Sequence, residues 1–241
     1  MSVAYYPGAN RTIQYWAAKF IGSKMAPNVV VLHTTEGGGW PDYSGGATAP
    51  NLTIRADKAM KRFKIRQHFP LNRSSRALQN LIGGVETNTL NCIQIELIGS
   101  CVQKDGFGAV YWPDAPDWCY QALGKVLNTL AALYPAIPLT VPVLWLPYPT
   151  SYGPSQARMT GTQWSNFRGI CGHQHVPENV HGDPGNLPMG KILAPPPVVH
   201  PLADKVLADA KKGVATTTGK RRAAYAEIRD LIKPFTTGGT P

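Results

Sequence analysis

Short, β-rich apolar runs separated by loops constrain the fold of this chain more than any other feature. VVVLH at 29–33 opens into a Gly-rich loop, which indicates a buried strand ending at His33. NLTI at 51–54 and FKIRQHF at 63–69 flank a charged turn, and apolar and polar residues alternate in the second run. This pair predicts a β-hairpin with one wet face.

A later strand and one regular helix complete the pattern. CIQIELIGSC at 92–101 predicts a strand with Ile93 and Ile95 on one face and Glu96 on the other. From 117 to 134 the apolar residues recur at helical spacing, with an acidic start and a proline just after the end. Strands interleaved with a clear helix predict an α/β fold, a mixed central β-sheet flanked by helices.

The chain is long enough for one main domain with an appendage. Its 241 residues can bury one sizeable core, which we expect within residues 1–195. Residues 135–168 are rich in Pro, Tyr and Trp and predict a long surface insertion. Residues 196–241 predict a proline-rich spacer followed by a basic helical tail, whose role the sequence leaves open, as it does the oligomeric state.

Export signals and disulfides are not expected. No apolar run approaches the roughly 20 residues of a transmembrane helix, and the first residues lack the pattern of a signal peptide. Cys92 and Cys101 would be about 30 Å apart at the ends of one strand, too far for a disulfide. We therefore expect a soluble protein in the cytoplasm, with its four cysteines reduced and packed.

The charge is strongly positive and locally concentrated. The formal net charge is +10, and eight basic residues between 55 and 76 face one acid, Asp57. Nucleic acid, another anionic polymer and plain solvation all remain open as readings of this patch. Because the basic residues are not interleaved with stacking aromatics in a recognisable module, no specific nucleic-acid partner is expected.

Histidines give the strongest chemical signal. Three of the six histidines fall within GHQHVPENVHGDPG at 172–185. Catalytic zinc sites use three His or carboxylate ligands and leave one position open, and His173 and Asp183 are far enough apart to turn back onto one ion. His33 is the candidate third ligand, although a lone histidine after an apolar run is more often a core residue. His175 is an alternative ligand.

Three segments in this order, VVLHTTEGG, CIQIELIGS and GHQHVPENVHGDPG, resemble the type 2 N-acetylmuramoyl-L-alanine amidases. That family includes phage amidase endolysins and is related in fold to the peptidoglycan recognition proteins. The resemblance covers about residues 25–195.

The resemblance implies roles for five residues. His33, His173 and Asp183 correspond to the Zn²⁺ ligands, and Glu96 falls on the catalytic glutamate. His181 stands where many members have a lysine that stabilises the oxyanion, so that support would come from an imidazole instead. Beyond these, the aromatic residues Trp40 and Tyr43 either line the substrate groove or simply pack.

The implied function is zinc-dependent hydrolysis of the amide bond between N-acetylmuramic acid and L-alanine. A phage endolysin of this kind would wait in the host cytoplasm until it is released to the cell wall. Its partners would be peptidoglycan and, through the basic patch, an anionic cell-wall polymer. The alternatives are a module that binds peptidoglycan without cutting it and, from the charge alone, a nucleic-acid binder.

Overall fold

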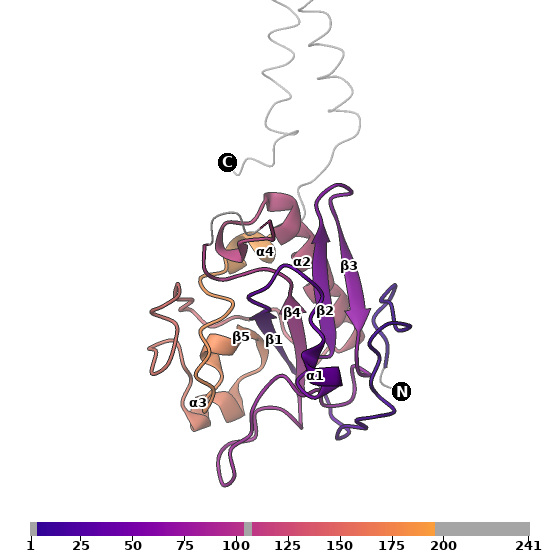
Figure 1. The fold of residues 1–241 in the computed structure, drawn as a ribbon. Helices are drawn as coiled ribbons and strands as arrows, with labels where there is room; N and C mark the ends of the chain where they lie inside the picture. The colour runs from indigo at the N-terminus through magenta and orange to yellow at the C-terminus, as the bar shows by residue number, and fades with distance from the viewer. Residues whose placement is uncertain (1–3, 104–107, 196–241) are drawn as a thin grey trace, which may run out of the picture. The chain divides into compact units, whose positions relative to one another are not determined.

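The computed structural model describes residues 4–103 and 108–195. A five-stranded sheet forms its centre, in the order β3-β2-β4-β1-β5 (Figure 1). The strands are β1 (Val29–Thr34), β2 (Leu52–Asp57), β3 (Arg62–Gln67), β4 (Cys92–Leu97) and β5 (Gly169–Gly172). The β2–β3 pair is antiparallel and the other pairs are parallel. The predicted mixed α/β sheet is therefore confirmed.

One long helix and several short ones surround this sheet. The long helix α2 (Asp117–Leu133) lies behind the sheet in Figure 1. The shorter elements are α1 (Tyr43–Gly46), α3 (Gly161–Asn166), α4 (Met189–Ile192) and the 3-10 turns η1 (Trp112–Asp114) and η2 (His173–His175). Within the described residues, no helix combines the length and apolar character needed to cross a membrane.

One face of the sheet forms the main apolar core, and the other carries polar side chains. Successive side chains of a strand point to opposite faces. Leu32, Ile95 and Ile54 belong to the larger buried cluster, which also contains the apolar side of α2. On the other face, Val31 and Cys171 pack in a smaller cluster, and polar side chains follow toward the carboxyl ends of the strands. That polar edge is where the candidate site lies.

Most of the expected elements occur, with shifted ends. The first strand, the hairpin and the helix are confirmed. β4 ends at Leu97 rather than at 101, because Gly99 takes φ +146° and the chain then bridges Gly37 and Tyr111 instead of continuing the ladder. The 135–168 segment is mostly irregular but contains the whole of α3, which the sequence did not predict.

The cysteines and the division of the chain also relate to the sequence predictions. All four cysteines are free and buried, as predicted. The chain divides into two units, Met1–Leu193 and Ala194–Pro241. The predicted spacer and basic helical tail at 196–241 lie outside the described residues.

Candidate metal centre

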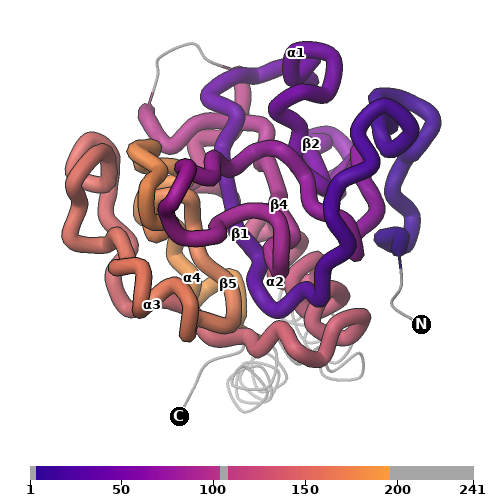
Figure 2. The backbone as a smooth tube through the Cα atoms, turned by 90° about the horizontal axis from the view of Figure 1, so that it is seen from below, coloured from indigo at the N-terminus to yellow at the C-terminus, as the bar shows by residue number. Residues whose placement is uncertain are grey.

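Three of the predicted site residues converge at the carboxyl edge of the sheet. His33 is the last residue but one of β1, which is flanked by β4 and β5. His173 follows β5 directly, and Asp183 returns to it after a loop. The orange segment around β5 lies beside the much earlier β1 in Figure 2. Residues 140 positions apart in the chain are thus brought into contact.

The distances within this group suit a metal ion. His33 Nδ1 lies 3.1 Å from His173 Nδ1, His173 Nδ1 lies 3.2 Å from Asp183 Oδ1, and His33 Nδ1 lies 3.7 Å from Asp183 Oδ2. Ligands about 2.0–2.1 Å from a tetrahedral ion are roughly 3.3 Å from one another. All three side chains are buried, at 1%, 7% and 7% exposure. Two imidazoles and a carboxylate at these separations can hold a divalent cation.

The protonation states also suit a cation. Burial, followed by the neighbouring His173, lowers the pKa of His33 to about 3, although Asp183 acts in the opposite direction. Burial alone would raise the pKa of Asp183, but the two histidines and the backbone N–H of Thr34 hold it below its usual range. His33 is therefore neutral and Asp183 ionised near neutral pH, which are the forms that coordinate metals.

Asn179 orients the second histidine. Its amide nitrogen donates to the carbonyl oxygens of Pro177 and Gln79 at 3.0 and 3.3 Å, so its oxygen faces His173. Because that oxygen can only accept, His173 donates from Nε2 across 3.2 Å and keeps the Nδ1 lone pair for an ion. Such partners fix the tautomer and the ring of a metal-binding histidine. Asn179 was not among the site residues predicted from the sequence.

Gln174 and Gly172 shape the loop that carries two of the ligands. The Gln174 N–H donates to the Asp183 carbonyl at 2.9 Å, and its side-chain amide donates to Gly185 at 2.7 Å. A Cβ on Gly172 would lie 2.6 Å from Pro184 Cδ, so only glycine allows this close approach. These contacts hold the chain after β5 and the chain around Asp183 against each other.

Glu96 lies next to His33 in the sheet. The two residues are paired in the parallel register of β1 and β4, so their side chains share a face. The Oε2 atom of Glu96 is buried and has no hydrogen-bond partner among the described residues. Burial, with the nearby carboxylates of Asp183 and Glu36, raises the pKa of Glu96 well above its usual value. A carboxyl group in this state is suited to taking up and releasing a proton.

A hydrogen-bonded chain runs from Tyr43 into the interior on the same face. Tyr43 Oη lies 2.7 Å from Thr53 Oγ1, which lies 2.8 Å from His68 Nε2, and His68 Nδ1 lies 2.6 Å from the carbonyl oxygen of Gln14. A carbonyl oxygen only accepts, so His68 donates from Nδ1, Thr53 donates to Nε2, and Tyr43 donates to Thr53. Sequence reasoning missed Thr53 and His68, since neither stands in a recognisable motif.

The remaining candidates separate into near and distant ones. His181 is 66% exposed, its ring stacks on His173 at 4.9 Å, and its Nδ1 lies 4.0 Å from Asp183 Oδ1. His175, the alternative ligand, lies outside the three-residue group, since its ring accepts from the Gly172 N–H and donates to the Leu144 carbonyl. Cys171 is likewise outside that group and packs in the smaller apolar cluster.

The two aromatic residues of the loop after β1, Trp40 and Tyr43, have different surroundings. Trp40 is partly exposed, and the Arg66 guanidinium lies 3.9 Å from its ring centroid. Tyr43 is also partly buried, and burial followed by the nearby Glu96 raises its pKa above the usual value. The Tyr43 side chain therefore lies close enough to Glu96 to feel its charge.

The fold and this group define an α/β protein with a buried His–His–Asp cluster able to hold a metal ion. No protein-family model matches the sequence, and no curated protein matches it. Among solved structures, a mutant structure of PlyL is similar, with 14% identity over 48% of this chain and 67% of that chain, at a TM-score of 0.33.

Proposed function

We propose that this chain is a zinc-dependent N-acetylmuramoyl-L-alanine amidase that cuts bacterial peptidoglycan as a phage endolysin. The observation that carries the proposal is the buried group of His33, His173 and Asp183. Its members come from the first and the last of the three segments on which the sequence resemblance rests, and Glu96 from the second lies beside His33.

The chemistry of the site suits hydrolysis of an inert amide. A bound Zn²⁺ ion in a three-ligand site supplies Lewis-acid activation of a water molecule and of the scissile carbonyl. Glu96 takes the proton from the attacking water and passes it to the leaving amine of L-alanine, which its raised pKa favours. His181, exposed beside His173, donates a hydrogen bond to the developing oxyanion.

The proposal extends to partners and location. The substrate is peptidoglycan, and the basic residues of β2 and β3 attract an anionic cell-wall polymer by long-range electrostatics. The enzyme is held in the host cytoplasm and meets the wall only at lysis.

Metal content and product release together test the proposal. We expect about one zinc per chain in the purified protein, and a strong loss in His33→Ala, His173→Ala and Asp183→Ala, measured by elemental analysis. His181→Ala is the control, because this exposed histidine is not among the three ligands and should leave the zinc content unchanged.

The second readout is the bond that is cut. Purified peptidoglycan incubated with the zinc-loaded protein should release new L-alanine amino termini, detected by mass spectrometry. Zinc binding without such termini would reject the hydrolase and leave a peptidoglycan-binding module. Absence of zinc in the wild type would reject the metal centre itself.

A further inference from the structure

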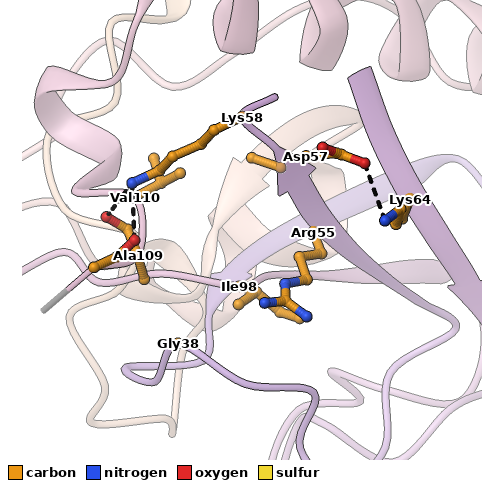
Figure 3. Close-up of a pocket in the computed structure, with 10 residues that line it drawn as sticks. Gly38, Arg55, Asp57, Lys58, Lys64, Ile98, Ala109 and Val110 are labelled. Carbon is orange, nitrogen blue, oxygen red and sulfur yellow. Dashed lines mark hydrogen bonds and ion pairs between the residues drawn. The ribbon is translucent and has the colours of Figure 1, made fainter. Parts of the chain in front are cut away.

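A basic hollow lies at the carboxyl end of β2, apart from the candidate metal centre. Its volume is about 320 Å³, and it is lined by the end of β2, the start of β3, the residue after β4 and the chain at 108–110 (Figure 3). Arg55, Lys58 and Lys64 contribute cations, and Asp57 contributes one acid. Ile98 adds an apolar wall.

Two of the three cations in this hollow have hydrogen-bond or ion-pair partners among the described residues. Lys58 Nζ donates to the carbonyl oxygens of Gly108 and Ala109 at 2.8 and 3.4 Å, which fixes the ammonium over the hollow. Lys64 Nζ lies 3.0 Å from Asp57 Oδ2, so the one acid among the described lining residues is already paired. The two contacts are the dashed lines of Figure 3.

Arg55 is the cation left over. No hydrogen bond or ion pair joins its guanidinium to any residue in the described part of the chain, and the side chain is exposed. In Figure 3 the guanidinium lies beside Ile98 and points into the hollow. Five N–H donors without an acceptor, next to two further ammonium groups, make a site for an oxyanion.

The register of the sheet places this hollow close to the metal centre. His33 is paired with Glu96, and Glu96 with Thr53, so these side chains stand in one row on one face. Arg55 is two residues beyond Thr53 on that face, opposite Lys64. With strands about 4.8 Å apart and about 3.3 Å per residue, the Cα atoms of His33 and Arg55 are roughly 12 Å apart. A single extended ligand can reach both places.

We propose that the Arg55 hollow is a subsite for an oxyanion, a carboxylate or a phosphate, carried by the same ligand that reaches the metal centre. A guanidinium matches the planar fork of a carboxylate and binds phosphate equally well, and the volume is that of a small-ligand site. The inference rests on the proposed function for the identity of the ligand, since peptidoglycan carries peptide carboxylates and wall polymers carry phosphates.

Binding to metal-free protein tests this subsite separately from catalysis. The probes are a soluble muropeptide with free carboxylates, the same muropeptide with its carboxylates amidated, and a glycerol-phosphate oligomer, each titrated by calorimetry. Arg55→Gln removes the free guanidinium. Lys125→Gln removes one charge from an exposed position of α2 and is the matched control.

The wild type should bind at least one anionic probe about tenfold more tightly than the amidated muropeptide, and Arg55→Gln should abolish that difference. Lys125→Gln should stay within about twofold of the wild type. A loss confined to the muropeptide assigns a carboxylate, and a loss confined to the oligomer assigns a phosphate. Equal affinities of wild type and Arg55→Gln for every probe would overturn the subsite.

The two proposals can fail independently. If wall cleavage is absent but the Arg55 dependence persists, the subsite stands and the amidase assignment falls. If cleavage and zinc binding are intact but Arg55→Gln binds like the wild type, only the subsite falls. Arg55 is exposed, so its replacement should leave the fold intact, which circular dichroism checks.

Discussion

Acid should destabilise the metal-free protein through His68. This side chain is fully buried, stacks on Trp16, and is held between Thr53 and the Gln14 carbonyl. Burial lowers the pKa of His68 to about 4, although the hydrogen bond to Gln14 acts in the opposite direction. The neutral imidazole is therefore the form that fits the folded protein.

The sign and the size of the effect follow from that pKa. The unfolded chain, with an ordinary histidine pKa of about 6.5, takes up the proton first, so stability is complete above about pH 6.5 and is lost as the pH falls toward 4. At about 1.36 kcal/mol for each pKa unit, His68 accounts for roughly 3.4 kcal/mol once the pH is below about 4. By about pH 5 the loss is roughly 2 kcal/mol.

Urea denaturation with a chelator present, at several pH values from about 7.5 to 4.5, measures this loss. His68→Gln should lose roughly 2 kcal/mol less than the wild type between about pH 7.5 and 5. His33 and His175, whose pKa values burial also lowers, steepen both curves alike. His181→Gln removes an exposed histidine and is the matched control.

The comparison uses the change with pH rather than absolute stability, because His68→Gln also removes hydrogen bonds at neutral pH. If His68→Gln and the wild type lose the same free energy of unfolding on acidification, the buried neutral imidazole is not the cause.

Three further outcomes follow from the metal centre. Glu96→Gln should keep its zinc but lower turnover about 10²–10⁴-fold, and full activity would exclude it as the proton carrier. Asn179→Ala should weaken zinc binding about 10–100-fold in a chelator competition, because His173 then loses the hydrogen bond that fixes its tautomer. Gly172→Ala should cost about 1–3 kcal/mol in thermal denaturation through the clash with Pro184, whereas Gly190→Ala, whose added Cβ would meet nothing within 4 Å, should not.

Local periodicity explains what the sequence could predict. The alternation in the hairpin and the helical spacing of α2 depend on near neighbours, so both elements are legible from the chain itself. The separation of Ile95 and Glu96 onto opposite faces is legible for the same reason. The pairing of His33 with Glu96 is not, because parallel register depends on how distant strands pack.

The supporting residues of the site were the hardest to foresee. Histidines and an aspartate in one loop attract attention as metal ligands, but Gln174 and Asn179 in the same loop carry no such signal. Their roles depend on carbonyl groups brought close by the fold. The contact between Tyr43 and Thr53 also depends on a tyrosine at φ +53°, a conformation that residue type alone does not predict.

The position of β5 has a consequence for biosynthesis. It is the last strand within the described residues and the edge of the sheet, and it pairs through only four residues with β1. A nascent chain that has emerged only as far as α2 already contains β1 to β4 and His33. It still lacks His173 and Asp183, the other two members of the candidate metal-binding group. A metal ion held by this group would be bound only after β5 has docked, and it would then link this short edge strand to the middle of the sheet.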